Sequence, residues 1–323
     1  MKNLLAMLSV AALVVGAPLE DELALQEGFE PVMAQPSLAD MELPAPALKP
    51  PHKSPFVAVG LATLFPGLGH VYLGDMRTAG GLGGGAGLEL GVGLVSRENR
   101  SVRNASLLTL QKTWEYGLYA AYRDVRLHNG NVGYAYKMPT DSLADLTAAP
   151  FRWSVLKKPE VWGGFLGAFA VVVGLSHLSS HKKAHPKEPH MHGLSTGRKI
   201  QPLVALPIGI GEEALFRGYL QPAFSEMTNP TGGIVLSSLV FGAAHIPNAW
   251  EMDSKDRKSY YRFGIPFITA FGAYFGWVAH KNQSLKEGVA LHTWYDFTLF
   301  AIRAAVTETA VTGQPGLHVM IPF

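Results

Sequence analysis

The C-terminal half of the sequence contains a hydrophobic run interrupted by side chains that could do acid–base chemistry. In GIGEEALFRGYL, from Gly209 to Leu220, the charged residues are Glu212, Glu213 and Arg217. On a helix, Glu213 and Arg217 lie at i and i+4 with the acid first, the favourable order for an ion pair. Glu212 points about 100° away around the helix and has no partner within the motif. We therefore expect Glu212 to be free for catalysis.

Two later hydrophobic segments each supply a histidine. Phe241 and His245 lie at i and i+4 in VFGAAHIP, and His292 and Asp296 repeat this spacing in VALHTWYDF. Residues four apart share one face of a helix. Ionisable groups within membrane segments are functional candidates by default, so a carboxylate and two imidazoles on three apolar segments predict one site.

The three patterns EEALFR, FGAAH and HTWYD resemble the EExxxR, FxxxH and HxxxN/D motifs of the CPBP family. This family of intramembrane metalloproteases or glutamic proteases includes the type II CAAX prenyl endopeptidases, Abi-like proteins and bacteriocin-processing enzymes. The motifs occur in the family's order over about the last half of the chain, and Asp296 stands where many members have Asn. The resemblance implies an intramembrane endopeptidase, a hydrolase, acting on a membrane peptide or protein.

The residue types suggest how such a hydrolysis would proceed. Water is the expected nucleophile, because the chain has no cysteine and none of the three motifs contains a serine in a GxSxG elbow. Glu212 with His245 would activate the water. His292 and Asp296 would stabilise the oxyanion, a role worth roughly 3 to 4 kcal/mol for one donor in other enzymes. Glu213, Arg217 and Phe241 are expected to support these four catalytic residues.

Two alternatives use the same residues. Glu212, His245 and His292 match the His2Glu ligand set of catalytic zinc, although HExxH is absent. In the second alternative the charged residues only hold helices together, as in a non-catalytic membrane scaffold or a bacteriocin-immunity-type protein. We favour the enzyme without a metal or other cofactor, because the resemblance implies a glutamate-dependent peptidase and uncompensated intramembrane charge marks function.

Composition predicts the fold class. The chain has 323 residues, 48% hydrophobic and only 16% charged, and its net charge of +2 gives no reason to expect nucleic acid as a partner. We expect an all-α polytopic bundle in a lipid bilayer, with about seven transmembrane helices. The expected spans are 56–72, 79–95, 161–178, 200–224, a helix from 232, 264–280 and the helix that carries His292. Residues 101–127 have an apolar stripe and are expected to form an amphipathic helix on the membrane surface.

The expected domain organisation starts with an export signal. Residues 1–17 have the pattern of a signal peptide or an uncleaved anchor. A Pro/Ala-rich tether at 18–55 follows. Residues 56–160 would form a membrane hairpin with the amphipathic region, and residues 161–323 the CPBP-type protease domain. This order predicts an integral protein of a bacterial inner membrane. The histidine-rich stretch between His177 and His192 is better explained as a solvated loop than as a metal site.

Overall fold

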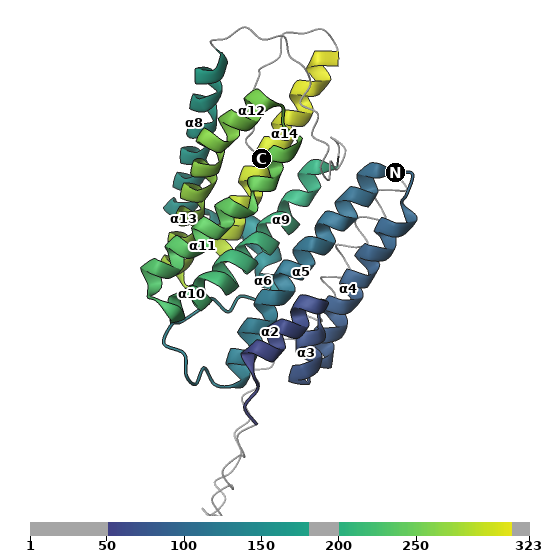
Figure 1. Cartoon of the computed structure of the whole chain (residues 1–323), viewed down its shortest axis with the longest axis vertical. Helices are drawn as coiled ribbons and strands as arrows, with labels where there is room; N and C mark the ends of the chain where they lie inside the picture. Colours follow the sequence, from purple (N-terminus) through teal and green to yellow (C-terminus); the bar gives the residue numbers. More distant parts are fainter. Residues whose placement is uncertain (1–50, 181–199, 312–323) are drawn as a thin grey trace, which may run out of the picture. The chain divides into compact units, whose positions relative to one another are not determined.

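The computed structural model describes residues 51–180 and 200–311, and all regular elements within these ranges are helices (Figure 1). The all-α fold class is therefore confirmed for this part of the chain. The expected signal at 1–17, the tether up to residue 50 and residues 181–192 of the histidine-rich stretch lie outside the described residues. From Lys53 onward the described residues form one compact unit, and the expected domain boundary between residues 160 and 161 lies inside it.

The first expected span is divided by a turn. Residues 56–72 form two short helices, α2 (Pro55–Leu64) and α3 (Leu68–Leu73), instead of one. Pro66 has no backbone N–H to continue a helix. Gly67 follows it with φ 93°, and a Cβ there would lie 2.5 Å from the carbonyl oxygen of Ala79. The second apolar segment forms α4 (Met76–Val95), which begins where Asp75 accepts a hydrogen bond from the Thr78 N–H at 3.0 Å.

The helix expected on the membrane surface lies inside the bundle, so that prediction is wrong. This helix, α5 (Arg100–His128), packs against α2 and α4 and against α9 (Ala205–Glu212) (Figure 1). Lys112 and Glu115 of its polar face are only 5% and 9% exposed. They point into the protein because they find charged partners there, so the polar face of α5 is an interface between helices.

A connection of short helices joins α5 to the C-terminal part of the bundle. It contains α6 (Leu143–Ala148), η1 (Ala149–Phe151) and α7 (Trp153–Leu156), followed by the long α8 (Pro159–Ser180). Before α6, the Asp141 carboxylate accepts hydrogen bonds from the Leu285 N–H at 2.7 Å and the Ser284 hydroxyl at 3.2 Å. These bonds hold the start of α14 (Lys286–Val311), the helix that carries His292 and Asp296.

The EEALFR segment lies in a continuous helical run that changes its hydrogen-bond register. The run consists of η2 (Gln201–Val204), α9, the π-helical η3 (Glu213–Leu220) and α10 (Gln221–Met227). At the end of η3, the Gln221 N–H donates to the Phe216 carbonyl oxygen five residues back, and Pro222 follows. Because proline has no N–H and clashes with the carbonyl four residues before it, the wider turn relieves this position. Single π turns of this kind are frequent at functional sites.

The same arrangement recurs in the next long helical run. After α11 (Pro230–Ala244) and η4 (Ile246–Glu251) come α12 (Ser254–Ser259), the π-helical η5 (Tyr260–Gly264) and α13 (Ile265–Asn282). The Ile265 N–H donates to the Tyr260 carbonyl oxygen, again five residues back and directly before a proline, Pro266. Each π segment in the described chain is thus explained by the proline that follows it.

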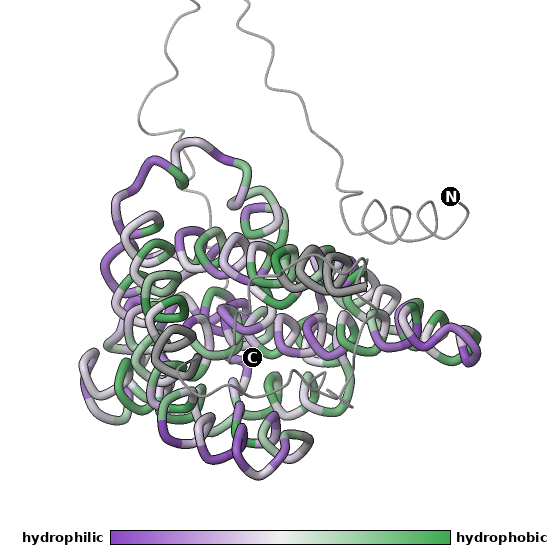
Figure 2. The backbone as a smooth tube through the Cα atoms, turned by 90° about the horizontal axis from the view of Figure 1, so that it is seen from above, coloured by the Kyte–Doolittle hydropathy of each residue, from purple (hydrophilic) through white to green (hydrophobic). Residues whose placement is uncertain are grey.

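Hydropathy separates one helix from the others. Within the described residues, Pro230–Trp250 is long and apolar enough to cross a membrane by length and composition, while Pro55–Leu64 and Pro159–Gly174 are shorter apolar helices. Four large apolar side chains of α11 are exposed: Val235, Leu236, Leu239 and Val240. Hydrophilic positions lie among the central helices as well as at helix ends (Figure 2). The expected number of seven spans therefore stays a prediction. The helices that carry the EEALFR and HTWYD motifs contain charged residues, which lower their mean hydropathy.

Candidate active site

The most deeply buried part of the site is the ion pair predicted within the first motif. Glu213 and Arg217 in η3 are 0% and 1% exposed, and Nη1 of Arg217 lies 3.2 Å from Oε1 of Glu213. Nη2 of Arg217 donates to the Gly272 carbonyl oxygen of α13 at 3.1 Å. The guanidinium also stands over the Phe241 ring of α11, 4.2 Å from its centre. Arg217 therefore joins η3, α13 and α11.

Glu213 also holds the histidine of the third motif. Nδ1 of His292 lies 2.9 Å from Oε1 of Glu213, and the imidazole stacks on the Phe275 ring with their centres 5.0 Å apart. Because a carboxylate only accepts, Nδ1 is the donor in this bond. The other ring nitrogen, Nε2, faces two further carboxyl groups, Oδ2 of Asp296 at 3.6 Å and Oε2 of Glu212 at 3.8 Å. Both distances exceed a direct hydrogen bond.

Glu212 has a partner that its own motif does not supply. Oε1 of Glu212 accepts a hydrogen bond from Nζ of Lys112, on α5, at 2.9 Å. Glu212 has no partner within its motif, as expected, but it is not unpaired in the fold. Its counter-ion is Lys112, which lies 100 residues earlier in the chain. The remaining oxygen, Oε2, is the one that faces His292.

His245 ends α11 and is oriented by the backbone of its own helix. Its Nδ1 lies 2.8 Å from the Phe241 carbonyl oxygen. A carbonyl only accepts, so Nδ1 carries the proton and Nε2 is available for proton transfer in the neutral imidazole. The imidazole and the Phe241 ring, expected on one helix face, are in contact with their centres 4.6 Å apart and their planes tilted by 59°.

One cavity connects the four residues expected to be catalytic. It has a volume of about 150 Å³ and is lined by Glu212, His245, His292 and Asp296. The rest of its wall is mainly apolar and aromatic, with Phe241, Phe271, Phe275, Tyr295, Phe300, Ile208 and Ile268, and Asn248 adds an amide. Glu213 and Arg217 do not line the cavity. The arrangement places two carboxyl groups and two imidazoles around one small space with a mainly apolar wall.

Comparison with known families finds a match in the part of the chain that carries the three motifs. Residues 200–298 match the model of the type II CAAX prenyl endopeptidase Rce1-like family, and this range includes all three motifs. The chain carries an Rce1-like domain. No curated protein and no solved structure matches the chain. The Rce1-like family consists of membrane proteases, so the match supports a CAAX-type protease domain within residues 200–298 and an integral membrane protein.

The residues of the Rce1-like domain do not fit the zinc alternative as they are placed. Within residues 51–180 and 200–311, no three His, Asp or Glu side chains are arranged to hold one metal ion. Oε1 of Glu212, a ligand in that alternative, already has the ammonium of Lys112 at 2.9 Å. A cation bound there would have to share its carboxylate with a buried positive charge, which repels it.

Sequence reasoning missed the contribution of α5 to the Rce1-like site. On an amphipathic helix at the membrane surface, the polar residues of 101–127, which include Lys112 and Glu115, would face water. A signal for their burial exists in the sequence, since Lys112 and Glu115 can pair at i and i+3 on a helix within an apolar chain. That spacing gives no information on the distant partner, Glu212.

Proposed function

We propose that the protein is an intramembrane endopeptidase that hydrolyses a peptide bond of a membrane-associated peptide or protein. The observation that supports this most strongly is the cavity lined by Glu212, His245, His292 and Asp296, which lies within an Rce1-like domain. The export pattern of residues 1–17 favours the bacterial inner membrane as its location.

Glu212 and His245 activate water in this proposal. Oε1 of Glu212 is held by Lys112, so Oε2 is the oxygen that takes the proton from the attacking water. The water oxygen adds to the carbonyl carbon of the scissile bond and gives a tetrahedral intermediate. The proton then passes to the leaving amine, from Glu212 or through Nε2 of His245, as the carbon–nitrogen bond breaks. Products are a carboxylate and an amine, and Glu212 returns to its ionised form.

His292 and Asp296 stabilise the oxyanion. With Nδ1 of His292 bonded to the Glu213 carboxylate, a protonated imidazole directs its second N–H, on Nε2, toward the cavity. Charge balance supports this form. Around the cavity and its ion pairs lie four carboxyl groups, Glu115, Glu212, Glu213 and Asp296, but only two permanent cations, Lys112 and Arg217. The buried cluster becomes neutral when His292 and one carboxyl group carry a proton, and neutrality minimises the cost of burial.

Asp296 is the carboxyl group best placed to carry that proton. Glu212 and Glu213 each have a permanent cation within hydrogen-bonding distance, Lys112 and Arg217 respectively. Asp296 faces only His292, at 3.6 Å, among these groups. A protonated Asp296 acts as a donor to the oxyanion beside the imidazolium, which is the role that the third motif would need.

We propose further that the reaction is metal-free. The ammonium of Lys112 gives Glu212 a fixed counter-charge at 2.9 Å, which a metal ion would otherwise provide. Glutamate-dependent water activation needs no other cofactor.

A non-catalytic scaffold remains the second candidate, and the Lys112 pairing favours it. A protein that only needs helix cohesion would pair each buried acid with a base, as Glu212 is paired with Lys112 and Glu213 with Arg217. The cavity favours the enzyme over the scaffold, because side chains that only hold helices together need no space between them. Activity decides between the two.

The test is a cleavage assay with the purified protein in proteoliposomes. A panel of membrane-anchored peptides, with and without a prenylated C-terminus, is incubated with the parent and with Glu212→Gln, and products are read by mass spectrometry. We expect the parent to generate a new terminus in at least one peptide and Glu212→Gln to generate none. Equal product from both proteins would remove Glu212 from the reaction.

A further inference from the structure

Lys112 is a buried cation that the Rce1-like match, at residues 200–298, does not include. It lies in the middle of α5 and is 5% exposed. Its Nζ donates to Oε1 and Oε2 of Glu115 at 3.0 and 3.1 Å and to Oε1 of Glu212 at 2.9 Å. These three contacts use all three donors of an ammonium group. The position of Nζ is therefore fixed by acceptors on two helices, Glu115 on α5 and Glu212 on α9.

The two helices approach each other closely at this point because of a glycine. A Cβ at Gly211 would lie 2.8 Å from Cβ of Lys112 and 2.9 Å from its Cα and Cδ. Contacts below 3.0 Å essentially never occur for real Cβ atoms, so any side chain at 211 would move α5 away from α9. Because Gly211 has no side chain, the backbone and the aliphatic part of Lys112 can pack directly beside Glu212.

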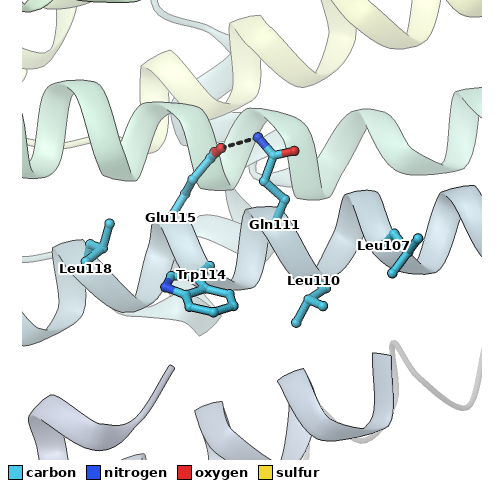
Figure 3. Close-up of a pocket in the computed structure, with 6 residues that line it drawn as sticks. All are labelled: Leu107, Leu110, Gln111, Trp114, Glu115 and Leu118. Carbon is cyan, nitrogen blue, oxygen red and sulfur yellow. Dashed lines mark hydrogen bonds between the residues drawn. The ribbon is translucent and has the colours of Figure 1, made fainter. Parts of the chain in front are cut away.

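Glu115 is supported from its other side by the same helix. Nε2 of Gln111 donates to Oε1 of Glu115 at 2.9 Å, and Figure 3 shows this bond on α5, with Trp114 and three leucines along the same helix. The bonds from Gln111 and Lys112 hold the Glu115 carboxylate in place. Glu115 therefore balances Lys112 within α5 and directs the remaining donor of the ammonium to Glu212.

We propose that Lys112 is a positioning residue for the catalytic carboxylate. By binding Oε1 of Glu212, it leaves Oε2 as the basic oxygen and fixes the direction in which that oxygen faces the cavity. It also supplies the positive charge that favours the ionised carboxylate in a buried site. This inference rests on the proposed protease function and assigns the region before residue 161 a part in it, since the counter-ion of Glu212 lies on α5.

The charged groups around Glu212 come from four directions, and Lys112 is the cation in direct contact with it. The others are Glu115 on α5, Glu213 and Arg217 on η3, His245 at the end of α11, and His292 and Asp296 on α14. Arg217 is bonded to Glu213 and Gly272, so it cannot replace Lys112 without giving up these contacts. Removal of the ammonium consequently leaves Glu212 without its nearest positive charge.

The experiment compares kcat and KM of Lys112 variants in the proteoliposome assay. We expect Lys112→Met to lower kcat by about 10- to 100-fold, by analogy with metal sites, where the loss of a group that orients a ligand costs that much. KM should stay the same, since Lys112 does not line the cavity. Lys112→Arg keeps the charge and should recover part of the kcat. Lys281→Met is the matched control, because it removes another lysine that pairs with a glutamate of a neighbouring helix, Glu160 at 3.0 Å, and should leave kcat unchanged.

A double variant separates positioning from mere charge balance within α5. If Lys112 only neutralises Glu115, then Lys112→Met with Glu115→Gln should restore the parent's kcat. If Lys112 acts on Glu212, the double variant should remain as slow as Lys112→Met, and Glu115→Gln alone should have a smaller effect. The double variant strands one acid fewer, so it takes the place of Lys112→Met should that protein fail to fold.

Glu212→Gln distinguishes failure of this inference from failure of the proposed function. An inactive Glu212→Gln beside a Lys112→Met with the parent's kcat would overturn the role of Lys112 and leave the protease intact. Recovery in the double variant would overturn it as well. A fully active Glu212→Gln would instead refute the proposed function on which the inference rests.

Discussion

Nδ1 of His292 lies 2.9 Å from Oε1 of Glu213, the same oxygen that accepts the Nη1–H of Arg217 at 3.2 Å. Glu213 is fully buried, so a single carboxylate without access to water neutralises an arginine and orients an imidazole. The second acid of the first motif thereby connects the helix cohesion supplied by Arg217 to the cavity lined by His292. Its loss should affect stability and rate together.

A double-mutant cycle tests the Glu213–Arg217 pair. We expect Glu213→Ala and Arg217→Ala each to lower the free energy of unfolding by about 3 to 5 kcal/mol, because each strands an opposite buried charge. The double variant should cost clearly less than the sum of the two. The measurement is reversible denaturation in detergent micelles, and additive single effects would mean that the two side chains do not pair.

Asp296 should respond to substitution according to whether it donates or accepts. Oδ2 of Asp296 is 3.6 Å from Nε2 of His292, too far to orient the ring by a direct bond, and Glu213 already fixes Nδ1. We expect Asp296→Asn to retain most of kcat, and Asp296→Ala to lose about 100-fold, as for one oxyanion donor. In the parent, activity should fall as pH rises through the pKa of Asp296, because deprotonation removes the donor.

The amide of Asn donates at every pH, so the descending limb of the pH–rate profile should move to higher pH in Asp296→Asn. Profiles of parent, Asn and Ala proteins test this together. A large loss of rate in the Asn variant would show that Asp296 acts as an ionised acceptor. Three identical profiles would make it a packing residue.

Metal removal should leave the activity unchanged. Dialysis of the proteoliposomes against a strong chelator, followed by metal analysis and rate measurement, should give the rate of the untreated protein, because Lys112 already provides the counter-charge of Glu212. Loss of activity on chelation with recovery on adding zinc alone would contradict the metal-free mechanism and favour Glu212, His245 and His292 as ligands.

The sequence predicts the ion pair of the first motif better than it predicts the surrounding helices. Spacing at i and i+4 correctly pairs Glu213 with Arg217, because both lie in one helical run and local geometry decides the contact. The bond between Glu213 and His292 joins residues 79 positions apart and depends on how η3 packs on α14. No local pattern contains that information.

The errors at α2 and α5 have different physical origins. Hydropathy predicts one span at 56–72 because Pro66 and Gly67 are not charged, but the backbone of these two residues ends the helix. For α5, the amphipathic pattern is present. The error was to expect water at its polar face, where other helices lie instead. Lys112 binds Glu115 and Glu212 instead of water, and only the tertiary arrangement reveals the contact with Glu212.

The central claim is that Glu212 is the base that activates water, and Glu212→Gln tests it most directly. Glutamine keeps the volume and can still bond to Lys112 through its carbonyl oxygen, but it does not take up the proton of water at neutral pH. We predict that Glu212→Gln inserts and unfolds like the parent, while kcat on the cleaved peptide falls below detection. A folded Glu212→Gln protein that cleaves the same bond at the parent's rate would contradict the account.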